Sequence, residues 1–247
     1  MAAPTKLEFD VDMTCGNCVK KIENAFKGIE GVKSLDVNLL RGQVIVECNL
    51  GTEKVKSVIE STGKKAVLKG MGGSKGHLGA AVSIMDVGSE AIRGLIRLVQ
   101  TDERQLVIDG TLDGLTPGVH GLCVHECGDI SEGCNSCGDI YGRDVSGQVS
   151  MGELGDIKAG PDGRAEFRIV SDRLKVWEMI GRSLIIHNGS IDEIKRNNSR
   201  DQRLTCGIIA RSAGLFQNSK KICACDGVTQ WEERNVPAAG HSRQAHL

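Results

Sequence analysis

The sequence lacks the features that would place the protein in a membrane or on nucleic acid. No apolar run approaches the ~20 residues of a membrane span, and the opening stretch MAAPTKLEFD lacks the basic-then-apolar layout of a secretory signal. Lysine and arginine are scattered and the net charge is −1, so no strongly basic face is expected. These absences predict a cytoplasmic protein with no membrane span and no nucleic-acid partner.

Cysteine is the unusual component that is present. The chain has ten cysteines in 247 residues. A reducing compartment discourages structural disulfides, so thiols there favour metal or redox roles. They are grouped unevenly along the chain, and their positions are Cys15, Cys18, Cys48, Cys123, Cys127, Cys134, Cys137, Cys206, Cys223 and Cys225.

The first 70 residues alternate between strand and helix patterns. LEFDVDM has a period of two, CVKKIENAFKGI repeats apolar residues at helical spacing, and two more alternating segments precede a second helix between Thr52 and Gly63. With a last strand at AVLKG the order is βαββαβ, which is the α+β ferredoxin-like arrangement. The glycine-rich residues 71–77 are predicted to be a flexible linker.

The pattern changes after the linker. Residues 78–215 consist of short strand-like segments separated by turn signals such as DGLTPG and AGPDG, which indicate an all-β sandwich or barrel. Residues 216–247 are polar and have too few apolar side chains for a core, so we expect a mostly disordered C-terminal tail. The sequence therefore predicts two folded domains, a linker and a tail.

The pair in MTCGNC lies between the first strand and the first helix. Cys15 falls in the loop and Cys18 in the opening helical turn, where backbone N–H groups and the helix dipole lower a thiol pKa. Two thiolates suit two-coordinate Cu(I), whereas structural zinc requires four ligands. A thioredoxin-like redox pair is the alternative. MTCGNC resembles the MTCxxC motif of heavy-metal-associated domains, and this resemblance implies that residues 1–70 bind Cu(I) through Cys15 and Cys18.

Four motifs of the second domain resemble copper,zinc superoxide dismutase: LTPGVHGLCVHECGD, GCNSCG, GRSLIIHNG and RLTCG. The resemblance implies a Greek-key barrel, but the family's copper ligands are incomplete. Cys123 replaces one histidine and Ile140 another, while His125 and His187 remain. Because redox copper needs imidazole ligands and a thiolate beside Cu(II) invites its own oxidation, we expect no useful dismutase activity. Cys123, His125 and His187 form either a vestigial site packed as core or a soft-metal site.

The resemblance to the dismutase family also extends to a zinc-ligand position, a disulfide and a dimer interface. Glu153 alone stands at a zinc-ligand position, so zinc is not expected in this domain. The resemblance implies a structural disulfide between Cys134 and Cys206, which would stabilise the fold by about 4 kcal/mol. Residues matching the family's dimer interface are also kept, and these are Gly128, Ile180 and Gly181.

The complete order of domains, with CACDG in the tail, resembles the family of copper chaperones for superoxide dismutase. The resemblance implies Cu(I) uptake from an unidentified donor and docking of the barrel on superoxide dismutase as a heterodimer, with a homodimer as the alternative. It gives Cys223 and Cys225 the catalytic role of completing copper insertion and disulfide formation in that client. A copper-sequestering protein, a weak superoxide dismutase and a general thiol oxidoreductase remain the alternative functions.

Overall fold

The computed structural model describes residues 4–74, 76, 78–143, 150–197, 202–221 and 229–233. The chain divides into two compact units, each containing more than one stretch of sequence. The first unit comprises residues 1–80, 101–103 and 213–247, and the second comprises residues 81–100 and 104–212. The segment that follows the barrel in the sequence therefore belongs to the first unit.

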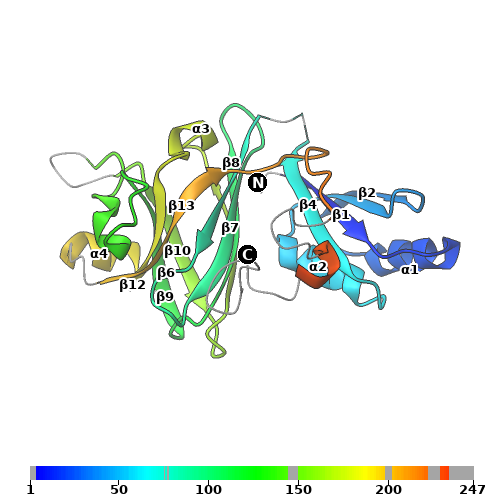
Figure 1. The fold of residues 1–247 in the computed structure, drawn as a ribbon, viewed down its shortest axis with the longest axis horizontal. Coiled ribbons are helices and arrows are strands. Elements are labelled where there is room, and N and C mark those ends of the chain that lie inside the picture. Colours follow the sequence, from blue (N-terminus) through cyan, green and yellow to red (C-terminus); the bar gives the residue numbers. More distant parts are fainter. Residues whose placement is uncertain are drawn as a thin grey trace. The chain divides into compact units, whose positions relative to one another are not determined.

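The first unit has the βαββαβ order that the sequence predicts (Figure 1). Its four strands form an antiparallel sheet in the order β2-β3-β1-β4. The elements are β1 (Thr5–Val11), α1 (Gly16–Phe26), β2 (Val32–Asn38), β3 (Gln43–Cys48), α2 (Thr52–Glu60) and β4 (Ala66–Gly73).

Alternation along β1 separates the two faces of this sheet. Leu7 and Phe9 are fully buried on the face that forms the core of the unit. Helix α1 buries Cys18, Ile22 and Phe26, which are four residues apart and so lie on one side of the helix. The opposite face of β1 carries Glu8 and Asp10, whose carboxylates form hydrogen bonds with polar groups of the same unit.

The predicted linker at residues 71–77 is wrong in part, because β4 continues to Gly73. Met71 pairs with Leu7 and Gly73 pairs with Thr5 in an antiparallel ladder. The glycines are required by a close approach, since a Cβ at Gly70 would lie 2.5 Å from the carbonyl oxygen of Gly214. The glycine run therefore marks a crowded strand as well as a connection between the units.

The second unit is an all-antiparallel, nearly closed barrel in which the ladder order is β10-β9-β12-β13-β5-β7-β8-β11, with β6 pairing with β13 (Figure 1). Strands β10 and β11, at the two ends of this order, lie against each other. The strands are β5 (Ala80–Met85), β6 (Val87–Gly88), β7 (Arg93–Gln100), β8 (Leu106–Asp113), β9 (Gly118–His125), β10 (Glu153–Ala159), β11 (Ala165–Ser171), β12 (Ser183–Asn188) and β13 (Arg203–Arg211).

Short helices connect the barrel strands, and the sequence patterns did not indicate them. They are η1 (Gly133–Cys137, a 3-10 helix), α3 (Val176–Met179) and α4 (Ile191–Asn197). The barrel core is aliphatic, with Ile96, Leu98 and Ile108 among its fully buried side chains. None of the helices in the described ranges is both long and apolar enough to cross a membrane.

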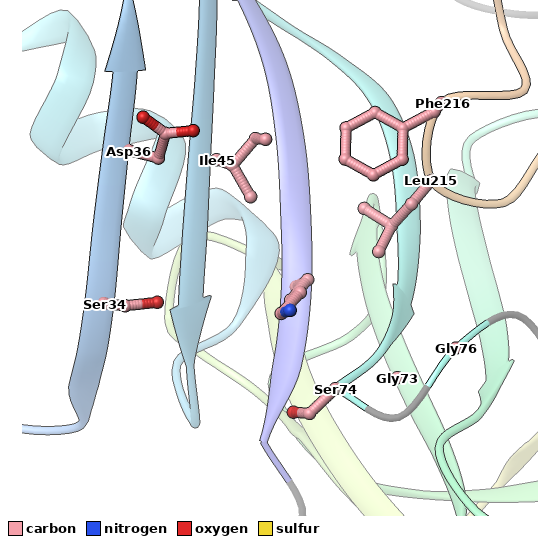
Figure 2. A pocket seen from close by; sticks show the side chains of 9 residues that line it. Ser34, Asp36, Ile45, Gly73, Ser74, Gly76, Leu215 and Phe216 are labelled. Atoms are coloured by element: carbon pink, nitrogen blue, oxygen red, sulfur yellow. The ribbon is translucent and has the colours of Figure 1, made fainter.

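The chain that leaves the barrel runs over the polar face of the first unit's sheet. The Phe216 backbone N–H donates to Glu8 Oε2 at 2.6 Å, and Gln43 Nε2 donates to the other oxygen of that carboxylate at 2.6 Å. A pocket of about 460 Å³ is lined by Ile45 of the sheet and by Leu215 and Phe216 (Figure 2). These contacts were not expected from the polar composition of the tail.

A second part of the tail also has structure. Helix α5 (Gln230–Glu233) belongs to the first unit. Gln230 Nε2 donates to Asp10 Oδ2 at 3.0 Å, so this short helix is held at the end of β1. The expectation of disorder from residue 216 onward therefore does not describe residues 216–221 and 229–233. Cys223 and Cys225 lie outside the described residues.

Candidate metal centre

Two cysteines meet where β1 passes into α1. Cys15 has extended backbone angles and immediately precedes the helix, and the Cys18 N–H donates to the Cys15 carbonyl at 3.0 Å. The two sulfur atoms are 3.6 Å apart. Cys15 is exposed and Cys18 is 6% exposed. The strand–helix junction thus presents one accessible and one recessed sulfur to the same point.

The environment of Cys18 stabilises its thiolate. Its pKa is lowered to about 6, chiefly by the backbone hydrogen bond from Thr14 and then by the Thr14 hydroxyl, whose oxygen lies 3.6 Å from the sulfur. The Cys15 backbone lowers the pKa further. A thiolate that forms near neutral pH at a helix start is the type of ligand that soft cations prefer.

The barrel brings together the two histidines that match copper ligands. Along β9 and β12, His125 pairs with Ser183 and His187 with Gly121. The His125 and His187 Nε2 atoms are 3.0 Å apart, and the ring centroids are 5.2 Å apart. Burial lowers the pKa of His125 to about 4 and that of His187 to about 3. Both rings are therefore neutral at pH 7, and one ring N–H donates to the other.

The other two positions that match copper ligands, Cys123 and Ile140, hold side chains that pack in the core. Cys123 is fully buried in a small cluster with Ile140 and Ile194. Burial, with the negative charge of Glu153, raises the pKa of the Cys123 thiol, so it stays protonated at neutral pH. In the part of the chain that the structure describes, no three His, Cys, Asp or Glu side chains are grouped in a way that could hold a metal ion. The arrangement resembles a packed core more than a ligand set.

Glu153, at the matched zinc position, has a partner that the sequence did not reveal. Lys195 Nζ of α4 lies 2.9 Å from Glu153 Oε2. The carboxylate is 5% exposed, so its charge is compensated inside the protein by an ammonium group. No sequence spacing pointed to Lys195, because α4 itself was not anticipated.

Three buried thiols gather beside η1. Cys134, Cys137 and Cys206 form one apolar cluster with Ile185. No disulfide joins any of the cysteines in the described ranges, and the bridge between Cys134 and Cys206 stays a prediction. The sequence patterns assign no role to the third thiol, Cys137. The C-x-x-C spacing of Cys134 and Cys137 was the available signal for it.

The surface matched to a dimer face contains a tight glycine contact. A Cβ at Gly128 would collide with the carbonyl oxygen of Gly181. Ile180 is partly buried and packs on the barrel core. The close approach of two loops therefore accounts for Gly128 without any partner, and the docking role remains a separate proposal.

The residues that flank the tail motif contact one ion pair of the first unit. Lys69 Nζ lies 3.3 Å from Asp10 Oδ2 and also donates to the Lys220 carbonyl. Gln230 contacts both members of this pair, and its own N–H donates to the Lys221 carbonyl at 3.0 Å. Lys220 and Gln230, which lie on either side of Cys223 and Cys225 in the sequence, are thus both hydrogen-bonded to the ion pair near the end of β1.

Comparison with known proteins agrees with both units. Residues 8–65 match the heavy-metal-associated domain and residues 92–209 match the copper/zinc superoxide dismutase family. Two relatives named copper chaperone for superoxide dismutase, from Mus musculus and Homo sapiens, are 46% and 45% identical over 96% of this chain and 92% of theirs. A superoxide dismutase 1 copper chaperone from Saccharomyces cerevisiae is 30% identical over 94% of this chain and 95% of its own.

The accessible thiol pair and the barrel with an incomplete ligand set define a class of protein, in which a heavy-metal-associated domain is joined to a dismutase-like domain. The two matched segments lie in that order along a single chain. With relatives of this identity and coverage, the chain belongs to the family of copper chaperones for superoxide dismutase.

Proposed function

We propose that this protein is a copper chaperone that delivers Cu(I) to copper,zinc superoxide dismutase and promotes disulfide formation in it. The observation that carries the proposal is the pair Cys15 and Cys18, whose sulfurs are 3.6 Å apart at a helix start, in a chain that also has a dismutase-like barrel. The pair takes Cu(I) as cargo. Its partly exposed position suits exchange with another protein's thiols, because ligand exchange requires access.

The barrel recognises the client and is not itself a dismutase. His125 and His187 are neutral and hydrogen-bonded to each other, while Cys123 is protonated and packed, which supports the absence of a redox copper site. Zinc is not expected either, since Glu153 is paired with Lys195. We propose that the surface around Gly128 and Gly181 forms a heterodimer with the client, in competition with a homodimer. The protein acts in the cytoplasm.

The tail acts on the client by thiol–disulfide exchange. Cys223 and Cys225 are the proposed catalytic pair, and they also bind Cu(I). The contacts of Lys220 and Gln230 with the pair formed by Asp10 and Lys69 support a role on the same unit that carries Cys15. A thiolate of the reduced client attacks the oxidised Cys223–Cys225 pair and forms a mixed disulfide. The second client thiolate then displaces the tail, so the client gains a disulfide and the tail is left as a dithiol, which oxygen must reoxidise before another cycle.

One assay separates the proposal from its alternatives. Copper-loaded protein is mixed with metal-free, disulfide-reduced superoxide dismutase under oxygen, and the activity and disulfide of the client are followed. We expect activation by the full chain and no disulfide formation with Cys223→Ser and Cys225→Ser combined. A copper-sequestering protein would bind copper and leave the client inactive. A weak dismutase would show activity without any client, and His187→Ala would abolish that activity.

A further inference from the structure

Cys206 of β13 has two thiol partners within contact. Cys134 and Cys137 lie three residues apart in η1, and both pack with Cys206 in one buried cluster. The three are 6%, 0% and 0% exposed for Cys134, Cys137 and Cys206. The sequence match accounts for one of the two pairings and leaves Cys137 without a role.

We propose that these three residues form an internal thiol–disulfide exchange site with two alternative bridges, Cys134–Cys206 and Cys137–Cys206. The Cys137 thiolate attacks Cys206 Sγ of the first bridge, the new sulfur–sulfur bond forms, and the bond to Cys134 breaks. Cys134 leaves as a thiolate and takes up the proton that Cys137 gave up. The exchange is redox-neutral, and the first bridge is formed from thiols by a disulfide oxidant such as oxidised glutathione, which is reduced to two thiols.

The electrostatic environment favours a thiolate on either side of Cys206. The hydrogen bond from Cys206 is the largest cause that lowers the pKa of Cys137 to about 6, and it also lowers the pKa of Cys134. Arg203 contributes to both, and its guanidinium donates at 2.7 Å to the Cys134 carbonyl and at 2.7 Å to the Gly138 carbonyl. The contact from Cys206 is present only while Cys206 is a thiol, so in the bridged states the charge of Arg203 is what favours a thiolate at the free outer cysteine.

Each outer sulfur has a carbonyl acceptor for the state in which it is reduced. Cys134 Sγ donates to the Val87 carbonyl at 3.6 Å, and Cys137 Sγ donates to the Asp129 carbonyl at 3.3 Å. Whichever bridge is present, the remaining thiol is therefore not left as an unpaired polar group in an apolar cluster. A structural disulfide with one fixed partner would not need a second buried thiol with its own acceptor.

Burial makes the exchange an internal reaction. Because all three sulfurs are shielded, a protein partner does not reach them directly, and a small disulfide reaches them during local opening. Cys127 is the exposed cysteine of this region, and its N–H donates to the Cys137 carbonyl at 2.9 Å. A Cys127→Ser background therefore removes, among the described cysteines, the exposed thiol of this region that could trap the bridge at the surface.

The test maps the bridges in the full chain. Protein with a chelator present is equilibrated in glutathione buffers, quenched with acid and alkylated, and peptides are fragmented between Cys134 and Cys137. We expect both bridges in the unsubstituted chain, in amounts within about tenfold of each other, since neither partner of Cys206 is sterically excluded. Cys134→Ser should keep Cys206 oxidised through Cys137, and Cys137→Ser should keep it oxidised through Cys134.

Three results would overturn the proposal. The first is a single Cys134–Cys206 bridge in the unsubstituted chain, a reading that does not depend on how any variant folds. The second is a freely alkylated Cys206 in Cys134→Ser that retains the circular dichroism of the parent chain. The third is protection of all three thiols that appears only when the chelator is omitted, because this would indicate a metal site in place of an exchange site.

Discussion

Cys18 and Cys123 are both buried cysteines in the two regions that match metal-binding families, and they differ in the hydrogen bonds and neighbours that set the pKa of the thiol. Cys18 lies at a helix start, 3.6 Å from a second sulfur, with a pKa lowered to about 6. Cys123 is packed with Ile140 and Ile194, and burial raises its pKa. Hydrogen bonds that stabilise the thiolate therefore lower the pKa of one cysteine, as a soft-metal ligand requires, whereas desolvation raises the pKa of the other.

The histidine pair of the barrel extends this contrast. His125 and His187 are closer together than the two sulfurs of the first unit, with 3.0 Å between Nε2 atoms. One of those nitrogens carries the proton that joins the rings, so the two Nε2 atoms are already hydrogen-bonded to each other. His187 Nδ1 has no hydrogen-bond partner among the described residues. Proximity of ligands is thus less informative than their protonation and access.

The largest expected effect comes from removing the thiol pair. Cys15→Ser with Cys18→Ser should lower the Cu(I) affinity of the first unit about ten-thousandfold, or about 5.5 kcal/mol, because no sulfur ligand remains at the junction. Competition with a coloured Cu(I) chelator measures the affinity, with Cys223→Ser and Cys225→Ser in the background so that the tail does not bind.

The matched control for this experiment is Cys48→Ser. Cys48 is a fully buried cysteine of the same unit, with its thiol donating to the Leu50 carbonyl. It should leave Cu(I) affinity unchanged. An unchanged affinity in Cys15→Ser with Cys18→Ser, together with a loss in His125→Gln with His187→Gln, would reverse the comparison between the two regions.

Acid should destabilise the barrel through its histidines. In the unfolded chain both titrate near pH 6.5, whereas in the fold the pKa values are about 4 for His125 and about 3 for His187. Between pH 6.5 and pH 4 the unfolded state binds more protons, so the free energy of unfolding falls as pH falls. The expected loss is about 2 kcal/mol between pH 6.5 and 5.5.

Trp177 reports on this transition because it lies in the second unit, once Trp231 of the first unit is replaced by Phe. Denaturant titrations at several pH values give the free energy of unfolding. His125→Gln with His187→Gln should flatten the dependence. Parallel pH curves for the parent and this variant would show that the histidines are not neutral in the fold.

Acid should also weaken Cu(I) binding by the first unit, because it protonates the Cys18 thiolate. Below pH 6 a proton competes with Cu(I) for Cys18, so the apparent affinity should fall up to about tenfold per pH unit on account of this residue. The affinity should be nearly independent of Cys18 protonation above pH 7. Chelator competition at pH 7 and pH 5 measures the difference, and Thr14→Val should move the fall to higher pH because it removes the hydroxyl contact.

The sequence predicted most of what local pattern determines. The βαββαβ order followed from periodicity, and the placement of Cys15 and Cys18 followed from a strand that ends directly before a helix. The loss of barrel ligands followed from Cys123 and Ile140 at motif positions. These features depend on residues close together in the sequence or on a recognisable motif.

What the sequence did not predict depends on contacts between distant segments. The glycines of β4 resemble a linker in isolation, and they are explained by the close approach of three distant residues, Thr101, Gly214 and Leu215. The tail looks polar, yet Phe216 is fixed by the Glu8 carboxylate more than 200 residues earlier in the chain. The proximity of Cys137 to Cys206 likewise depends on the packing of η1 against β13. Periodicity carries no information on such pairs.

The smallest expected effect is that of replacing Glu153, the residue of the barrel at the matched zinc position. Glu153→Gln removes the charge paired with Lys195, whose side chain is 32% exposed, so the free energy of unfolding should change by less than about 1 kcal/mol. Elemental analysis should give the same zinc content for Glu153→Gln and for the parent chain, after equal exposure to zinc and removal of loosely bound ions. A zinc content that falls with Glu153→Gln and not with Lys195→Met would mean that the carboxylate binds metal in preference to the ammonium group. Because Lys195 already supplies positive charge at the place where a zinc ion would otherwise be needed, we expect the carboxylate to stay paired within the chain.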